Sequence, residues 1–318
     1  ISAYPDKNKL VSGLLNLGFD GVEETAVGAA YVTEEYKKLI NKMEMDNILT
    51  SCCPTINLMI SKYYPELINN LAPVLSPVLV HGKLIKEKYG PETSVIFIGP
   101  CLSKIYEINQ DEDSRNVDFA ITFQDLDKWL LDENINLETI TPKELDTDSP
   151  YSRVYPISQG ILYDLKNHFK DKDSGDKISK YDLLSVSGLK DVENILNEIS
   201  NGKIKNVFIE INACSNGCVN GPMMPKNRTS VLEDTIKIKR YAEEIKDNEN
   251  KFDRNDLNKK FFNEKIEDFI PGEDKLKDIL MQIGKIKKDD ELNCGSCGYD
   301  TCRDKAIAVY QGKAELYM

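Results

Sequence analysis

The sequence predicts a two-lobed α/β fold in which each lobe is a mainly parallel sheet flanked by helices. Its 318 residues, of which 41% are hydrophobic and 30% charged, suffice for two ordinary domains or one large two-lobed domain with a substantial core. Short apolar segments alternate with amphipathic ones, as in βαβ units. Three of the apolar segments run into cysteine residues. These observations also point to a candidate site at the strand ends.

The first third of the chain contains three predicted helices and one clear strand. The helices cover residues 32–43, 55–71 and 76–90. The second begins after Pro54, and Pro65 is expected to bend or break it. The third closes at a glycine, which is a common helix end. The strand, residues 93–100, delivers Cys101 at its carboxyl end.

The alternation continues as far as Cys214. The predicted strands cover residues 117–123, 181–188 and 203–214. The predicted helices cover residues 124–133, 158–169 and 189–202. The last strand also ends on a cysteine. Because the carboxyl ends of parallel strands lie on one side of a sheet, cysteines that are distant in sequence are expected to converge there.

Composition argues against several classes of function. No apolar run approaches the roughly 18 residues that would span a bilayer, so we expect no membrane role. The formal charge of −12, with lysine and arginine scattered, argues against nucleic-acid binding. The chain opens "ISAYPDKNKL", without a methionine or a signal segment, and we interpret it as a piece of a longer, cytoplasmic protein. Proteins or small molecules are the expected partners.

The eight cysteines favour metal ligation over disulfides. They are Cys52, Cys53, Cys101, Cys214, Cys218, Cys294, Cys297 and Cys302. A secreted disulfide framework usually belongs to a short chain with little core, which this chain is not. Four thiolates are what a cubane iron-sulfur cluster needs, and they also satisfy a tetrahedral zinc ion. Zinc ligands usually come as compact knuckles, whereas these follow three separate strands.

Three motifs carry a resemblance to a known family. The segments "TSCCP", "GPCLSKIYE" and "ACSNGCVNG" resemble the three successive signatures of the FeFe hydrogenases, the iron-only hydrogenase catalytic domain. The resemblance covers about residues 1–225, and three motifs in the right order make it specific. It implies reversible interconversion of protons, electrons and dihydrogen, with the metal cluster in the crevice between the two lobes.

The resemblance also implies a cofactor and its ligands. The family's H-cluster is a 4Fe-4S cubane joined through one cysteine sulfur to a two-iron unit with carbon monoxide, cyanide and an azadithiolate bridge. By motif, Cys53, Cys101 and Cys214 would hold the cubane. Cys218 would hold it and also bridge to the two-iron unit.

Three further residues match catalytic positions of the family. Cys52 matches the proton-relay thiol, although a thiol at this place could simply pack in the core. Lys104 matches the lysine that donates a hydrogen bond to an iron-bound cyanide, and Glu107 matches the carboxylate that orients this lysine. Without the neighbouring cysteine motif, a surface Lys-Glu pair would be the better interpretation of the last two.

The sequence departs from the productive members of the family along the proton route. The relay serine falls on Ala72, and one relay carboxylate falls on Lys38, although Glu35 survives. Methionines that normally pack on the two-iron unit are replaced by Gly99 and Asn212. These changes predict slow turnover or a different proton route, and a more polar or roomier pocket. They favour the sensory or regulatory type of hydrogenase.

The rest of the chain divides into two further regions. Residues 226–290 are rich in Lys, Asp, Glu and Asn and are expected to form a solvated helical and linker segment. Residues 291–318 contain "CGSCGYDTC", which resembles a small 4Fe-4S module with ligands Cys294, Cys297 and Cys302. Its fourth cysteine is expected beyond Met318, so the module is interpreted as truncated and its cluster as absent or incomplete.

The resemblance suggests partners and leaves one alternative function. Upstream ferredoxin-like domains or a ferredoxin-like electron donor or acceptor, maturation proteins that insert the two-iron unit, and a signalling partner are expected. Without that unit the fragment is expected to be inactive. The alternative is a non-catalytic hydrogenase-like iron-sulfur protein that acts in cluster assembly or electron transfer.

Overall fold

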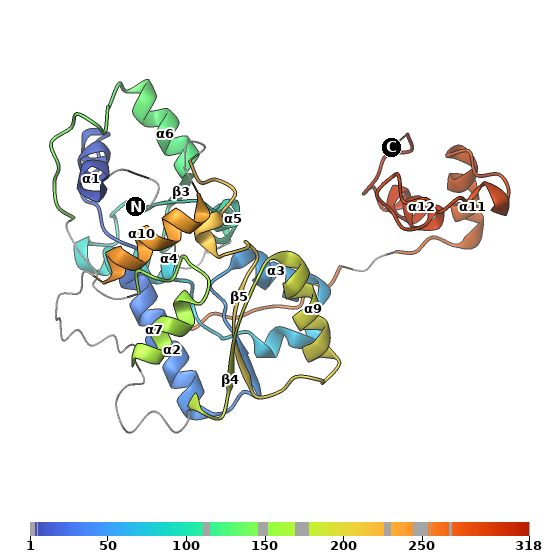
Figure 1. The fold of residues 1–318 in the computed structure, drawn as a ribbon, viewed down its shortest axis with the longest axis horizontal. Helices are drawn as coiled ribbons and strands as arrows, with labels where there is room; N and C mark the ends of the chain where they lie inside the picture. Colours follow the sequence, from blue (N-terminus) through green and yellow to red (C-terminus); the bar gives the residue numbers. More distant parts are fainter. Residues whose placement is uncertain are drawn as a thin grey trace. The chain divides into compact units, whose positions relative to one another are not determined.

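The computed structural model describes most of the chain and divides it into two compact units. The described residues are 4, 6–110, 115–145, 152–168, 178–225, 230–243, 254, 256–266 and 269–317. The first unit is Ile1–Glu264 and the second is Lys265–Met318. Each unit is described by itself (Figure 1).

The larger sheet of the first unit is parallel, as predicted. Its strand order is β1-β5-β4. The strands are β1 (Asn47–Leu49), β4 (Asp182–Ser187) and β5 (Val207–Asn212). Val207 pairs with Asn47 on one side and with Asp182 on the other, so β5 is the central strand. All six of its residues are buried and four of them are apolar, as expected of a strand that is covered on both faces.

Helices cover both faces of this sheet, and alternate residues of β5 point to the two faces. The covering helices are α2 (Ala26–Lys42) and α7 (Gly160–His168) on one face, and α3 (Pro54–Tyr63) and α9 (Leu189–Ser200) on the other. Phe208 packs in a core cluster with residues of α2 and α7, whereas Ile209 packs in a cluster with residues of α3 and α9. Figure 1 shows β4 and β5 between these two pairs of helices.

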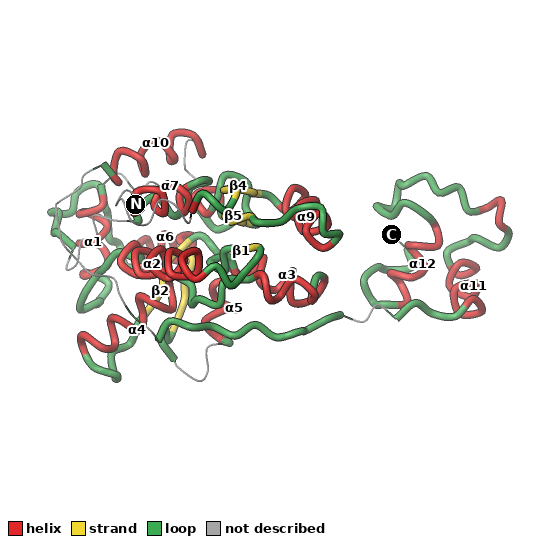
Figure 2. The backbone as a smooth tube through the Cα atoms, turned by 90° about the horizontal axis from the view of Figure 1, so that it is seen from below, coloured by secondary structure: helices red, strands yellow, loops and turns green. Residues whose placement is uncertain are grey.

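The smaller sheet is a parallel pair and forms a second layered body within the same unit. It consists of β2 (Ile96–Gly99) and β3 (Phe119–Thr122). Its helices are α1 (Lys7–Asn16), α4 (Pro77–Tyr89), α5 (Leu102–Asn109) and α6 (Phe123–Asp132). Separate core clusters fill the space between this sheet and α4 with α5, and between it and α1 with α6. Figure 2 shows β2, α4 and α5 below α2, and β4 and β5 above it.

Most predicted elements are confirmed, with small shifts at their ends. The break at Pro65 is confirmed, because α3 ends at Tyr63 and a 3₁₀-helix, η1 (Pro65–Asn70), follows. The helix predicted to begin at residue 32 begins earlier, at Ala26. Its first turn packs closely on α4, where a Cβ atom on Gly28 would lie 2.2 Å from the carbonyl oxygen of Pro77. This close approach extends the helix beyond the predicted boundary.

Residues 256–264, here called the return segment, correct the expectation of a fully solvated linker. Leu257 is only 1% exposed and belongs to the core cluster around α2. The N–H of Leu75 donates to the carbonyl oxygen of Leu257, and the N–H of Lys259 donates to that of Pro73. Sparse apolar residues suggested solvation, but two of them suffice to dock an extended segment that also forms backbone hydrogen bonds.

The remaining described helices are mostly those of the charged region and the tail. In the first unit these are α10 (Val231–Ala242) and the 3₁₀-helix η2 (Cys218–Asn220). In the second unit they are α11 (Glu273–Gln282), η3 (Lys288–Asp290) and α12 (Cys302–Tyr310). Leu276, Ile279 and Ala306 form the small core between α11 and α12. In the described part of the chain, every helix is too short or too polar to cross a membrane.

A buried carboxylate ties α7 to the larger sheet, and its removal should destabilise the first unit. Glu210 of β5 is fully buried, and it accepts hydrogen bonds from the backbone N–H groups of Gln159 (2.7 Å) and Leu162 (3.1 Å). Glu210→Ala removes the side-chain acceptor of the Leu162 N–H and leaves the N–H of Gln159 with only the hydroxyl of Ser185 (3.2 Å), so we expect a loss of about 2 kcal/mol in the free energy of unfolding. Urea unfolding measures it. Glu210→Gln keeps an acceptor and should lose less; equal losses would contradict this role.

Candidate functional site

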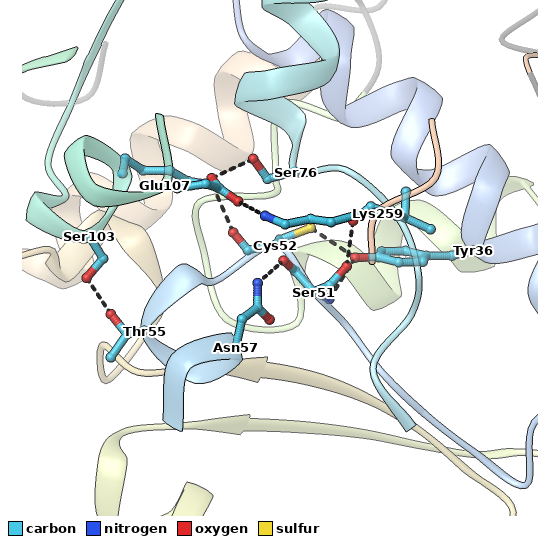
Figure 3. A network of polar contacts seen from close by, with 11 residues as sticks. Tyr36, Ser51, Cys52, Thr55, Asn57, Ser76, Ser103, Glu107 and Lys259 are labelled. Atoms are coloured by element: carbon cyan, nitrogen blue, oxygen red, sulfur yellow. Dashed lines mark hydrogen bonds and ion pairs between the residues drawn. The ribbon is translucent and has the colours of Figure 1, made fainter. Parts of the chain in front are cut away.

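Two of the candidate ligands stand at helix starts that face each other. Cys53 is the N-cap residue of α3, and Cys101 is the N-cap residue of α5. The two helix starts are joined by a 2.6 Å hydrogen bond between the hydroxyl groups of Thr55 and Ser103 (Figure 3). A helix N-terminus carries partial positive charge and unpaired N–H groups, so it favours an anionic group nearby. Each of the two cysteines therefore stands at a helix end, which favours an anionic group there.

The other two candidate ligands lie in the turn that follows β5. The N–H of Gly217 donates to the carbonyl oxygen of Cys214, and Cys218 begins η2. Gly217 has a φ of 88°, and a Cβ atom there would lie 2.7 Å from the carbonyl oxygen of Pro156. Only glycine fits this conformation and this space. The glycine therefore fixes the turn that carries both thiols.

All four thiols line one cavity of about 1150 Å³, together with Cys52 and Lys104. The cavity wall includes Gly99 at the end of β2 and Asn212 at the end of β5, so it lies between the two sheets. Among the described residues, no three His, Cys, Asp or Glu side chains come together at the spacing of ligands to a single metal ion. The donors surround a space much larger than one ion.

The chemistry of this donor set fits an iron-sulfur cluster. Burial raises the pKa of Cys218, and the charges of Cys53, Cys101 and Cys214 raise it further. Burial likewise raises the pKa of Cys53. Backbone hydrogen bonds with Ala213 and Ile56 offset part of this increase. Four thiolates that share one cavity repel one another unless cations lie between them, and an iron-sulfur core supplies that positive charge. Cys218 is accessible because it faces this cavity.

Lys104 and Glu107 form a buried ion pair at the cavity wall. The ammonium of Lys104 donates to Glu107 Oε2 (2.6 Å) and to the carbonyl oxygen of Cys52 (3.1 Å). Glu107 also accepts from Ser76 Oγ (2.8 Å) and from Lys259 Nζ (2.8 Å), as Figure 3 shows. The surface-pair interpretation is wrong, because both side chains are buried. Lys104 and Glu107 each form at least one hydrogen bond besides the one that joins them.

The ion pair stays charged despite its burial. Burial alone would lower the pKa of Lys104, but the charge and hydrogen bond of Glu107, together with the charges of Cys52 and Cys101, outweigh this and the pKa is raised. Burial alone would raise the pKa of Glu107, but Lys104 and Lys259 outweigh this and the pKa is lowered. Lys104 therefore presents a permanent positive charge to the cavity at neutral pH.

The thiol of Cys52 faces a tyrosine rather than a carboxylate. Its Sγ lies 3.0 Å from Tyr36 Oη, and the N–H of Ser51 also donates to this hydroxyl oxygen, at 3.2 Å (Figure 3). Burial raises the pKa of Cys52 to about 12, although the hydrogen bond with Tyr36 and the charge of Lys104 act against this. Cys52 is therefore a protonated thiol at neutral pH.

The structure shows what surrounds Ala72 and Lys38, the two positions at which the sequence lacks the relay residues expected from the family. Ala72 is fully buried in the core cluster that contains Tyr36. The ammonium of Lys38 pairs with Glu35 at 2.7 Å. A polar chain that the sequence analysis missed runs nearby. The hydroxyl of Thr33 lies 2.7 Å from Tyr155 Oη and donates to Asp164 Oδ2 at 2.6 Å.

The two departures expected to change the cavity lie in its wall, but one of them opens little space. Gly99 is covered by the ring of Phe97, because a Cβ atom at Gly99 would lie 2.5 Å from that ring. Asn212 is buried, and its amide lies 3.5 Å from a carboxylate oxygen of Glu210. The aromatic side chain two residues before Gly99 is a local signal that could have been noticed in the sequence.

The three tail cysteines belong to the second unit. Cys302 is the first residue of α12, and its N–H donates to Asn293 Oδ1 at 2.9 Å. Hydrogen bonds with Ser296 lower the pKa of Cys294, which is exposed. Cys297 lies between them in the same turn-rich stretch. The tail thus holds three thiols in a short loop with one turn and in the helix start that follows it.

The different thiol environments predict an order of reaction with an alkylating agent. In cluster-free protein at pH 7.5, iodoacetamide should modify Cys294 before Cys218, because only the thiolate reacts and the pKa values are shifted in opposite directions. Ser296→Ala should slow the modification of Cys294 severalfold. Peptide mass spectrometry over time measures both. Modification of Cys218 first, or no effect of Ser296→Ala, would contradict the assignment.

Comparison with known proteins places these features in a family. Residues 3–222 match the model of the iron only hydrogenase large subunit, C-terminal domain, and residues 290–318 match a model described as a putative Fe-S cluster. The fold resembles a solved variant of the FeFe hydrogenase HydA1 from Chlamydomonas reinhardtii, with a TM-score of 0.61 and 21% identity. That match covers 76% of this chain and 78% of the other.

Curated relatives are of two kinds. Iron hydrogenase 1 of Clostridium pasteurianum is 27% identical over 71% of this chain and 46% of its own length. The cytosolic Fe-S cluster assembly factor narfl of Danio rerio is 24% identical over 67% of this chain and 64% of its own length. The chain thus spans about half to two thirds of these relatives. On its family match, its fold and its cysteine motifs, the chain belongs to the iron-only hydrogenase large subunit, C-terminal domain family.

Proposed function

We propose that the first unit binds an H-cluster and catalyses the reversible conversion of two protons and two electrons to dihydrogen, slowly and in the service of hydrogen or redox sensing. The observation that carries this proposal is the buried Lys104–Glu107 pair, whose lysine lines the same cavity as the four candidate ligands. A cubane alone needs no buried ammonium group directed at it. An anionic, cyanide-bearing two-iron unit does.

The residues divide the work of binding. Cys53, Cys101 and Cys214 would hold the cubane, and Cys218 would hold it and bridge to the two-iron unit. When bound, this cofactor supplies the site at which dihydrogen is split or formed. Within the described residues, two protein oxygens take up two of the three ammonium protons of Lys104. The third proton is then left for a ligand in the cavity.

Cys52 is the proposed proton carrier next to the cofactor. Its protonated state at neutral pH suits a donor, and its carbonyl group is held by Lys104. Beyond it, the buried Ala72 and the pairing of Lys38 with Glu35 support the interruption of the usual relay. A slow proton supply limits turnover, which suits a sensor better than a producer of dihydrogen.

The proposed partners follow from this function. A ferredoxin-like protein or upstream ferredoxin domains would exchange electrons with the cubane, and maturation proteins would insert the two-iron unit. The tail would carry a second 4Fe-4S cluster on Cys294, Cys297 and Cys302, with a fourth ligand from elsewhere. A signalling partner would receive the change of redox state. No nucleic-acid partner and no membrane role are proposed, and the proposed location is the cytoplasm.

Loss of the Cys52 thiol tests the proposed chemistry. The full chain is reconstituted with iron, sulfide and a synthetic two-iron cofactor, and hydrogen/deuterium exchange is measured by mass spectrometry of the gas. Cys52→Ala should lower the exchange rate by about 100-fold, a typical contribution of a positioned proton donor. Its iron content should equal that of the parent. No exchange in the parent would refute the hydrogenase function, and unchanged exchange in the variant would refute the role of Cys52.

The second candidate is a non-catalytic iron-sulfur protein of cluster assembly. Its support is the similarity to curated cluster assembly factors, which is about as high as that to several hydrogenases. Under this function the cavity would take a cubane but no two-iron unit. Infrared spectra of the reconstituted protein separate the two candidates. Bands of iron-bound carbonyl and cyanide support the hydrogenase, and a cubane without these bands supports the assembly function.

A further inference from the structure

The return segment brings a second lysine to the buried carboxylate of the site. The ammonium of Lys259 lies 2.8 Å from Glu107 Oε1, and the side chain of Glu107 is only 3% exposed. Glu107 Oε2 is already occupied by Lys104 and Ser76. Each carboxylate oxygen of Glu107 thus has its own ammonium partner.

The extended backbone of the return segment directs the side chain of Lys259 toward Glu107. Alternate residues of an extended segment share one face. Leu257 packs in one core cluster and Phe261 packs against another, so the face that they share points inward. Lys259 lies between them on this face. Lys260 lies on the opposite face and is exposed.

Several contacts fix the register of the segment. Asn258 forms an antiparallel bridge with Val74. The carboxylate of Asp256 pairs with Lys83 of α4 at 2.9 Å. At the other end, the N–H of Glu264 donates to the carbonyl oxygen of Ser61. Since a shift by one residue would turn Lys259 outward, these contacts hold its ammonium on Glu107.

We propose that Lys259 is a positioning residue for the cluster site. This proposal rests on the proposed function in one respect, namely that the cavity holds an anionic cluster. Lys259 holds Glu107 in place, and it adds the charge that makes the buried group positive overall. Lys104 and Glu107 alone cancel each other. With Lys259 the three side chains carry one net positive charge next to the cavity, and this charge favours electron uptake by the cluster.

The test measures the reduction potential of the cubane without the two-iron unit. The full chain is used in a Cys302→Ser background, which removes a ligand of the tail cluster, and the titration is followed by electron paramagnetic resonance. Lys259→Met should lower the equilibrium constant for one-electron reduction by about threefold to tenfold, a shift of about 30 to 60 mV to more negative potential. Lys259→Arg should keep the parent's potential.

The matched control is Lys260→Met, which removes an equal charge one residue away on the outward face. Its potential should stay at the parent's value. No shift in Lys259→Met, or an equal shift in Lys260→Met, would overturn the proposal. If Lys259→Met does not fold, Lys259→Gln carries the test, because it can still donate a hydrogen bond to Glu107 but has no charge.

A second readout separates this proposal from the proposed function. In protein loaded with the two-iron cofactor, Lys259→Met should shift a cyanide stretching band in the infrared spectrum, and Lys260→Met should not. If the parent shows no cyanide bands, the hydrogenase function fails, and the potential of the cubane still decides the role of Lys259. The cyanide bands and the potentials could also be identical in the parent and in Lys259→Met. Lys259 would then have only a structural role, in anchoring the return segment.

Discussion

The candidate site of the first unit depends on one electrostatic constraint: four cysteine side chains share a cavity, and as thiolates they repel one another. Burial and neighbouring charges raise the pKa of Cys218 and Cys214, so neither thiolate is stable there without a cation. A fold that keeps such residues together must supply positive charge from elsewhere. An iron-sulfur core provides most of it, and the protein around the cavity is arranged to provide more.

The protein's share of this positive charge comes from three sources, of which the last lies far from the others in the sequence. The starts of α3 and α5 are tied together by Thr55 and Ser103, and each carries a cysteine at its cap position. Lys104 contributes a buried ammonium group from the first turn of α5. The return segment contributes Lys259, whose contact with Glu107 leaves the group with excess positive charge.

The sequence predicted the strands well, because β5 is buried on both faces and four of its six residues are apolar. It also predicted the break at Pro65, because proline lacks the N–H that a continuing helix needs. The cysteines that follow β1 and β5 could be placed from the strand pattern, since these strands are parallel neighbours and their carboxyl ends share one side of the sheet. Local chemistry and periodicity were sufficient for these elements.

The contacts of Tyr36 and Lys259 could not be predicted in the same way. Tyr36 meets Cys52 only because α2 lies on the sheet that carries β1, and nothing in the local sequence marks this tyrosine. Lys259 stands in a segment whose charge resembles that of a linker. The apolar residues two positions before and after it, Leu257 and Phe261, are the one local signal of an inward face. That signal is too short to outweigh the composition around it.

The most direct test of the central claim is a crystal structure of the reconstituted full chain with anomalous diffraction recorded at the iron absorption edge. We expect a cube of iron sites bonded to the sulfurs of Cys53, Cys101, Cys214 and Cys218. Two further iron sites should lie next to Cys218, and none should be bonded to Cys52. A single metal ion among these four thiols, or a cluster bound through Cys52 in place of Cys53, would contradict it.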